Sequence, residues 1–278
     1  MKLQYLGTAA AEAFPAIFCH CDTCRRARLE GGKNIRMRAG LVVNDTVLID
    51  LPPDIYALSL SLNLDLGSVT DVFITHSHSD HFAVRELGMR GNGCFCYIGE
   101  NGSAPALNLY GNDGVEALLN TMPEEDRGGK DVKLTRVSYF ETYTAANGLR
   151  FTYLPASHKS DEHSGFYLVE GEGKRLVYAQ DTGLFPEETL AYLAGKPLDF
   201  LSLDCCFGRR SSGGWGHMGL PENRETVSRL REKGAVTDGT IIVVNHFSHN
   251  CGQLHEELEA EARPDGFLVS YDGMTVDL

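Results

Sequence analysis

The 278-residue sequence has no long apolar run, no internal repeat and no low-complexity tract. No apolar stretch reaches the ~18 residues that a membrane-spanning helix needs, so we expect no membrane segment. Glu12 interrupts the small residues that follow the first apolar segment, which argues against a secretory signal. These absences predict a cytoplasmic protein, in which cysteine thiols stay reduced.

Basic residues are also scarce. The chain has 25 lysines and arginines against 38 aspartates and glutamates, a formal net charge of −13, and no basic run of five or more residues. An acidic protein repels polyanions at long range, so nucleic acid polymers are not expected as partners. A small anionic ligand is still compatible with this charge, because bound divalent cations reverse the local field.

The chain has eight cysteines, and in a reducing compartment clustered cysteines indicate a metal site rather than a disulfide. Cys19, Cys21 and Cys24 form a Cys-x-Cys-x-x-Cys motif, a spacing typical of structural zinc, which takes four ligands. We predict His249 as the fourth ligand; buried thiols without metal are the alternative. The remaining cysteines are expected to be packed thiols: Cys94, Cys96, Cys205, Cys206 and Cys251.

Short apolar segments recur along the whole chain and predict strands. Residues 39–43 and 46–49 flank Asn44-Asp45 and predict a hairpin. Further strands are expected at 71–75, 134–140, 149–154, 164–169, 175–179, 200–204, 241–245, 266–271 and 274–277. Helices are expected at 53–62, 84–89, 115–119, 186–194, 221–232 and 252–262.

Strand clusters with interspersed helices predict an α/β sandwich. No domain boundary is visible, so we predict a single domain over residues 1–278. The stretch at about 91–147 has the fewest readable patterns, and two interpretations are open: an insertion that shapes the site, or merely a long excursion of the chain.

Metal-capable side chains are most concentrated in the segment Thr75-His76-Ser77-His78-Ser79-Asp80-His81, directly after the apolar run 72–74. A strand that ends on such a cluster aims several metal-capable side chains at one point of a sheet edge. Imidazoles crowd together where a cation replaces their lost hydration. The segment therefore predicts a metal site, with a polar surface loop as the alternative.

Three further residues are each the first strong ligand after an apolar strand. His158 follows the strand that ends at Pro155, Asp181 follows Gln180, and His246 follows Asn245. A lone histidine after a strand is more often structural than metal-binding. Together with the histidine cluster, these residues indicate a metal centre at one edge of the sandwich.

The order His-x-His-x-Asp-His, a distant His, an Asp and a late His resembles the metallo-β-lactamase fold over nearly the whole chain. The resemblance implies a four-layer αββα sandwich with two metal ions at one sheet edge. It implies that one ion is held by His76, His78 and His158, the other by Asp80, His81 and His246, and that Asp181 bridges them. Such ligands suit Zn, Mn, Ni or Fe.

Two features of the sequence narrow the resemblance to one group of enzymes within this fold. Secreted β-lactamases of the common type have a cysteine in the second metal site, and we find none here, which favours phosphoester hydrolases. The N-terminal cysteine motif and the late His-x-x-His resemble the cyclic phosphodiesterases of bacterial phosphonate degradation, as does Asp181-Thr182-Gly183. This implies a hydrolase that opens a small cyclic phosphodiester through a hydroxide bridging the two metals.

The glycine-rich loop 214–220 contains His217 and resembles a loop that contacts the substrate or its leaving group in that family. The resemblance implies a catalytic role for His217 as the proton donor, and Asp80 is also predicted to be catalytic. Asp50 and Asp204 are expected to orient ligand histidines. His255, in a helical pattern, is expected to be exposed.

Relatives of this kind are often dimers, so a homodimer is expected. Two other functions remain open at this stage. One is hydrolysis of a thioester or lactone on the same metal centre, and the other is a metal-binding scaffold without turnover.

Overall fold

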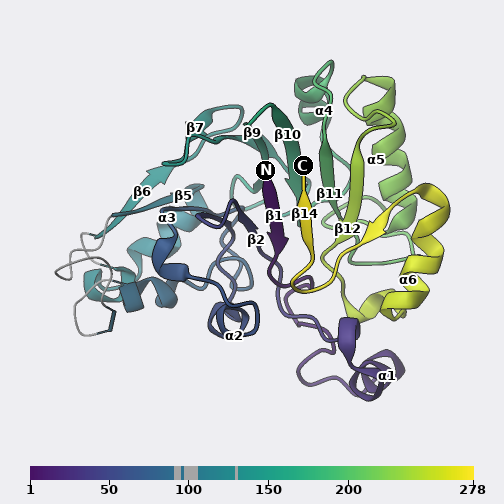
Figure 1. Cartoon of the computed structure of the whole chain (residues 1–278), viewed down its shortest axis with the longest axis horizontal. Helices are drawn as coiled ribbons and strands as arrows, with labels where there is room; N and C mark the ends of the chain where they lie inside the picture. The colour runs from purple at the N-terminus through teal and green to yellow at the C-terminus, as the bar shows by residue number, and fades with distance from the viewer. Residues whose placement is uncertain (91–94, 97–105, 129–130) are drawn as a thin grey trace.

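The computed structural model describes residues 1–90, 95–96, 106–128 and 131–278. Two seven-stranded sheets face each other, and helices cover their outer faces (Figure 1). The strand order is β14-β1-β2-β3-β4-β5-β6 in the first sheet and β13-β12-β11-β10-β9-β8-β7 in the second. The fold is therefore the predicted α/β sandwich. In the described part of the chain, no helix has the length and apolar character to cross a membrane.

The first sheet contains β1 (Lys2–Tyr5), β2 (Leu41–Val43), β3 (Val47–Ile49), β4 (Asp71–Phe73), β5 (Leu107–Gly111), β6 (Val132–Arg136) and β14 (Thr275–Asp277). The second contains β7 (Thr142–Thr144), β8 (Arg150–Pro155), β9 (Gly165–Gly171), β10 (Lys174–Ala179), β11 (Phe200–Asp204), β12 (Ile241–Asn245) and β13 (Leu268–Val269). The α-helices are α1 (Asp22–Glu30), α2 (Ile55–Ser61), α3 (Asp113–Asn120), α4 (Glu187–Leu193), α5 (Leu220–Glu232) and α6 (His255–Ala262).

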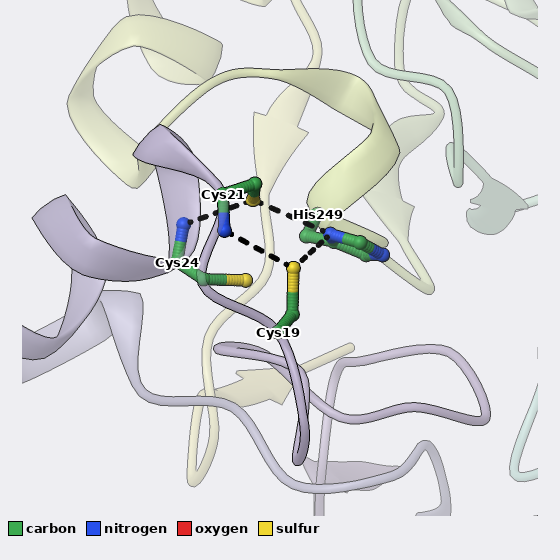
Figure 2. Close-up of side chains that lie close together, drawn as sticks. All are labelled: Cys19, Cys21, Cys24 and His249. Atoms are coloured by element: carbon green, nitrogen blue, oxygen red, sulfur yellow. Dashed lines mark hydrogen bonds between the residues drawn. The ribbon is translucent and has the colours of Figure 1, made fainter.

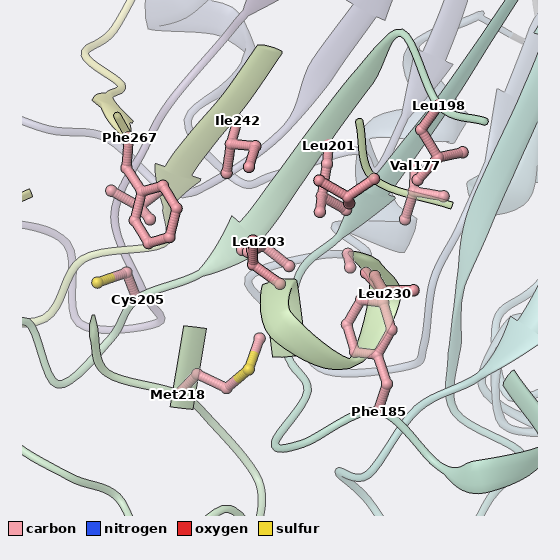
Figure 3. Packing of buried hydrophobic residues seen from close by; sticks show 14 of the residues in the cluster. Val177, Phe185, Leu198, Leu201, Leu203, Cys205, Met218, Leu230, Ile242 and Phe267 are labelled. Carbon is pink, nitrogen blue, oxygen red and sulfur yellow. The ribbon is translucent and has the colours of Figure 1, made fainter. Parts of the chain in front are cut away.

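The central core lies between the sheets and is rich in aromatic rings. Phe73 of β4 stacks on Phe151 of β8 at 3.8 Å between ring centroids and on Tyr110 of β5 at 4.2 Å. Outside the second sheet, side chains such as Leu201 and Leu203 of β11 pack against Leu230 of α5 (Figure 3). A third cluster joins the first sheet to α2 and α3. The central strands are thus buried on both faces, which explains the nearly continuous apolar runs in the sequence, whereas the edge strands β6, β7 and β14 are partly exposed.

Strand direction determines where the site forms. β3 and β4 are parallel, and so are β10, β11 and β12. β8 is antiparallel to β9, which is antiparallel to β10, so β8 and β10 run the same way. The residues that follow β4, β8, β10, β11 and β12 therefore emerge together at one edge of the sandwich.

Most predicted elements form, with shifted ends. The hairpin is confirmed: β2 pairs antiparallel with β3, and Asn44 and Asp45 adopt the positive φ angles that its tight turn needs. The helix predicted at 84–89 is present as a 3-10 helix, Val84–Arg90, and not as an α-helix. The strand expected at 266–271 shrinks to two residues.

One helix and two strands were missed: α1, β5 and β7. α1 has only Thr23, Cys24 and Ala27 buried, so it carries no apolar stripe that a pattern could reveal. β5 lies in the stretch interpreted as an insertion or a long excursion; residues 107–111 and 132–136 of that stretch extend the first sheet, whereas 91–94, 97–105 and 129–130 lie outside the described residues. Cys94, predicted as a packed thiol, is among those undescribed residues.

His255 is buried, which corrects the prediction that it is exposed. Its Nδ1 lies 2.8 Å from the guanidinium of Arg36, itself fully buried. Arg36 also donates to Thr8 and to the Ser270 carbonyl, so it ties the N-terminal segment to the C-terminal strands.

Candidate metal centres

The structure brings the seven predicted active-site ligands together at the edge where the parallel strands end. Their potential ligand atoms form two groups, each within 4.8 Å: His76, His78, His158 and Asp181 in one, and Asp80, His81, Asp181 and His246 in the other. Asp181 belongs to both groups. This is the arrangement that the resemblance implies, with one carboxylate between two sets of ligands.

Distances around Asp181 show how it is shared. Its Oδ2 lies 3.4 Å from His76 Nε2, 3.2 Å from His158 Nε2 and 3.4 Å from His81 Nε2. Its Oδ1 lies 2.7 Å from His246 Nε2. One carboxylate therefore faces four imidazoles.

These separations fit metal coordination. Two ligand atoms that each lie ~2.0–2.1 Å from a tetrahedral ion are about 3.4 Å apart. The buried His81 Nε2 has no hydrogen-bond partner among the described residues, and the 2.7 Å contact between His246 Nε2 and Asp181 Oδ1 lacks the geometry of a hydrogen bond. Buried polar atoms are normally satisfied, so unpaired atoms that converge on one point indicate a missing cation. The donor set of imidazoles and carboxylates suits a divalent ion.

Backbone turns at the strand ends aim two of the ligands. Asp181 lies two residues after β10 and His246 directly follows β12, and both have positive φ, 48° and 62°. Residues other than glycine rarely adopt this left-handed conformation, and it costs about 1–3 kcal/mol. The strain persists only where the surrounding structure holds the turn.

A buried hydrogen-bond chain lies directly behind these two turns. Ser270 Oγ donates to Asn245 Oδ1 at 2.6 Å, and Asn245 Nδ2 donates to Gln180 Oε1 at 3.2 Å. Gln180 Nε2 donates to Ser202 Oγ at 3.1 Å, and the Tyr5 hydroxyl donates to the same atom at 2.7 Å. Gln180 and Asn245 immediately precede Asp181 and His246. Their hydrogen bond therefore connects the backbone turn that carries one ligand to the turn that carries the other.

Gln180 and Asn245 are not among the predicted site residues. A signal was present, because both are polar residues at the end of an apolar strand, one position before a predicted ligand.

Other ligands are oriented through their remaining ring nitrogen. His81 Nδ1 donates to Asp50 Oδ2 at 2.7 Å, and Asp50 also accepts from the Thr75 amide at 2.8 Å. His158 Nδ1 donates to the Gly216 carbonyl at 2.8 Å. Asp50 thus occupies the position expected of it, with φ 66° at the end of β3.

The ligands differ in their pKa shifts: burial would lower the pKa values of His81 and His246, but the carboxylates they face, Asp181 foremost, raise both well above the usual range. Burial alone would raise the pKa of Asp181, but the surrounding histidines, His246 and His81 foremost, hold it well below its usual range. Burial lowers the pKa of His76 to about 3, so its ring is neutral and its lone pair is available. An ionised carboxylate beside a neutral imidazole is the form in which both bind metal.

His217 lies on the more open side of the centre. Its ring stacks on that of His246, with centroids 5.5 Å apart, and lies 5.0 Å from that of His158. Its Nδ1 lies 2.8 Å from Asp204 Oδ2, and His246 Nδ1 lies 3.4 Å from the same oxygen. Burial would lower the pKa of His217, but the Asp204 carboxylate outweighs it and the pKa is raised.

Asp204 is therefore a buried acceptor for His217 that also lies close to His246. Its other oxygen accepts from the amides of Cys206 and Met218. The Cys206 sulfur lies within 4.8 Å of ring nitrogens of His217 and His246. Cys206, predicted to be a packed thiol, is buried and also lies beside the metal centre.

The cysteine motif forms a second, separate cluster. The sulfurs of Cys19, Cys21 and Cys24 and a ring nitrogen of His249 all lie within 4.8 Å of one another. His249 Nδ1 is 3.3 Å from Cys19 Sγ and 3.5 Å from Cys21 Sγ (Figure 2). Backbone amides of Ala16, Cys21 and Cys24 point at the three sulfurs. Three sulfurs and one nitrogen at these separations suit tetrahedral zinc.

This cluster compensates for a thin local core. The small apolar group beneath it contains Ala9, Phe14, Ala27 and Leu254, and the adjacent Phe18 is almost fully exposed. Because His249 lies three residues after His246, the same segment connects the thiol cluster to the active-site edge.

Residues 45–237 match the model of the beta-lactamase superfamily domain, which is more than half of the chain. The chain belongs to this superfamily. Its fold is that of the metallo-β-lactamases, as both the sandwich and the ligand order predict.

Among curated proteins, this superfamily member is 26% identical to coenzyme PQQ synthesis protein B of Pseudomonas fluorescens, with all of both chains covered. Among solved structures, it resembles Zn²⁺-bound PqqB from Methylobacterium extorquens with a TM-score of 0.79 at 21% identity over all of both chains. It also resembles a diphosphatase of the PhnP family with a TM-score of 0.75 at 24% identity, covering all of this chain and 97% of the other. At these identities, the two structures support the fold.

Proposed function

We propose that the protein is a dinuclear metal-dependent phosphodiesterase that acts on a small, cyclic phosphodiester. The observation that carries the proposal is the position of Asp181, whose two oxygens face four imidazoles at 2.7–3.4 Å. The hydrogen-bonded pair of His217 and Asp204 lies beside it. A two-ion site with a proton donor at its open side suits the displacement of an alkoxide from phosphorus.

One ion would be held by His76, His78, His158 and Asp181, and the other by Asp80, His81, His246 and Asp181. When bound, the ions would lower the pKa of a water molecule and neutralise the phosphoryl oxygens as charge builds on them. Zn, Mn, Ni and Fe all suit these donors. A further zinc ion would be held by Cys19, Cys21, Cys24 and His249 as a structural element.

The chain's own residues would handle the leaving group. Opening the ring breaks one P–O bond and leaves an alkoxide that needs a proton. His217 is placed to give it: Asp204 occupies its Nδ1, so the proton would leave from Nε2. The proton lost by the attacking water restores the imidazolium by way of solvent. Asp204 would thus raise the proton affinity of His217 and fix its ring.

The test loads the metal-free protein with manganese, zinc or nickel and measures hydrolysis of bis-para-nitrophenyl phosphate, of a five-membered cyclic phosphate, and of a thioester. We expect turnover of the two phosphodiesters and little turnover of the thioester. Preferential cleavage of the thioester would favour the alternative function, hydrolysis of a thioester or lactone. No phosphodiester turnover with any metal would rule out the proposed function.

A second candidate is a role in cofactor synthesis, favoured by the whole-chain similarity to coenzyme PQQ synthesis protein B. The same assay separates the two, because the phosphodiesterase proposal requires turnover of simple phosphodiesters. A metal-loaded protein that leaves both phosphodiesters intact but restores PQQ formation to a strain lacking its own synthesis protein B would support the second candidate.

A further inference from the structure

Trp215 is the only tryptophan of the chain, and it is 64% exposed. Within the part of the chain that the structure describes, its indole makes no hydrogen bond and no contact with another ring or a cation. Single exposed apolar residues are common, so exposure alone decides nothing. The position of Trp215 beside the metal centre is what sets it apart.

The backbone of the Trp215 loop is fastened to two ligand-bearing segments. The Gly216 amide donates to the Ser157 carbonyl at 2.9 Å, and the Gly216 carbonyl accepts from the ligand candidate His158 at 2.8 Å. On the other side, the Leu184 amide donates to the Gly214 carbonyl at 3.0 Å. The loop is thus held against the segments that carry His158 and Asp181.

Close packing confirms this contact. A Cβ atom added to Gly183, two residues after Asp181, would lie 2.1 Å from the Gly214 carbonyl oxygen and 2.8 Å from the Trp215 Cα. Gly183 therefore allows the Trp215 backbone to lie directly on the Asp181 turn. Gly214 and Gly216, on either side of Trp215, have φ of 81° and 76°, a conformation that favours glycine.

The chain thus holds the backbone of a large aromatic residue in place next to the metal centre while leaving its ring without a partner. His217, two residues further on, reaches the centre and stacks on His246. An indole offers a rigid apolar face at a low cost in conformational entropy, which suits stacking against a planar group.

We propose that Trp215 is a specificity-determining residue that stacks on a planar ring of the substrate. The substrate would then be a nucleoside phosphodiester, with its phosphate at the metal centre and its nucleobase on the indole. This inference rests on the proposed function and narrows it from cyclic phosphodiesters in general to those that carry a base. It is distinct from a subunit contact, in which the same ring would be covered by a second copy of the chain.

Because Trp215 is the sole tryptophan, its fluorescence reports on this position alone. The metal-loaded protein is titrated with AMP and, separately, with ribose 5-phosphate, with excitation at wavelengths where adenine does not absorb. AMP should quench or shift the emission in a saturable manner, and ribose 5-phosphate should not. Equal responses to both, or no response to AMP, would overturn the proposal.

Kinetics provide a second readout with two matched substrates, 2′,3′-cyclic AMP and glycerol 1,2-cyclic phosphate. Both carry a five-membered cyclic phosphate, and only one carries a base. Trp215→Ala should lower kcat/KM for the nucleotide by roughly 5- to 150-fold, the range of base–aromatic stacking, and leave the glycerol compound unchanged. Trp215→Phe should restore part of the loss, and Tyr56→Ala, at an exposed aromatic on α2, should change neither.

The outcomes separate the two proposals. If neither cyclic phosphate is hydrolysed by the wild-type protein, the proposed function fails, and the AMP titration still decides whether the indole binds a base. An equal loss for both substrates in Trp215→Ala would mean that the residue only shapes the loop. A change from dimer to monomer in that variant would assign the ring to a subunit interface. Either result would overturn the stacking proposal.

Discussion

The buried hydrogen bonds that link Asn245, Gln180 and Ser202 behind the ligands allow a quantitative prediction for Gln180→Leu. Leucine is close to glutamine in size, so the change removes two hydrogen bonds with little change in packing. Ser202 Oγ keeps its bond from Tyr5, but Asn245 Nδ2 loses its hydrogen bond to Gln180 and is left with the Tyr178 hydroxyl nearby. One lost bond costs about 1 kcal/mol and one buried unsatisfied donor about 1–3 kcal/mol. The free energy of unfolding of the metal-free protein should therefore fall by about 2–4 kcal/mol.

The same change should weaken metal binding. Gln180 lies under the strained Asp181 turn and is linked to Asn245 under the His246 turn, and changes next to ligands typically lower metal affinity about 10- to 100-fold. Tyr5→Phe is the matched control, because it removes one bond at the far end of the chain. It should cost about 1 kcal/mol and leave metal affinity unchanged.

Two measurements check this prediction on metal-free protein. Urea unfolding gives the loss of stability, and competition with a chromophoric chelator gives the metal dissociation constant below the unfolding transition. The reasoning would be refuted if Gln180→Leu bound metal as tightly as the wild type, or if Tyr5→Phe weakened binding to the same degree.

Three further predictions concern the ligands and their partners. Asp181→Ala should abolish turnover and reduce the bound active-site metal, measured by elemental analysis, because both ligand groups share this carboxylate; retention of both ions would contradict its bridging role. Cys21→Ala should remove one zinc ion and lower the melting temperature while the active-site ligands stay in place, and unchanged zinc content would make the thiol-site assignment wrong. Asp204→Asn should move the high-pH limb of the rate profile to lower pH, because the carboxylate raises the pKa of His217 and a proton donor is lost above its pKa; an unmoved limb, with metal content intact, would exclude His217 as the donor.

Much of the fold could be predicted from the sequence because these strands are buried on both faces. Strand 241–245 begins with the uninterrupted apolar run 241–244, strand 200–204 is apolar apart from Ser202 and Asp204, and the hairpin turn is marked by Asn44-Asp45. α1 could not be found in this way, since it packs through few apolar side chains beside the thiol cluster.

The ligands were visible for a different reason. His158, Asp181 and His246 each end an apolar strand, and parallel strands bring their ends to one edge, so local order implies a shared site. The supporting contacts follow no such rule. Asp204 was expected to orient a ligand histidine, but its hydrogen bond to His217 was not predicted, and Arg36 meets His255 over a separation of 219 positions. Such pairs depend on how loops fold back, and no periodic pattern encodes them.

The most direct test of the account is the position and number of metal ions in the reconstituted protein. Elemental analysis combined with anomalous diffraction should find three divalent ions per chain. One ion should lie on each side of Asp181, and the third should lie among the three thiols. A reconstituted protein with no ions around Asp181 would contradict the central claim that this edge of the sandwich is a dinuclear centre.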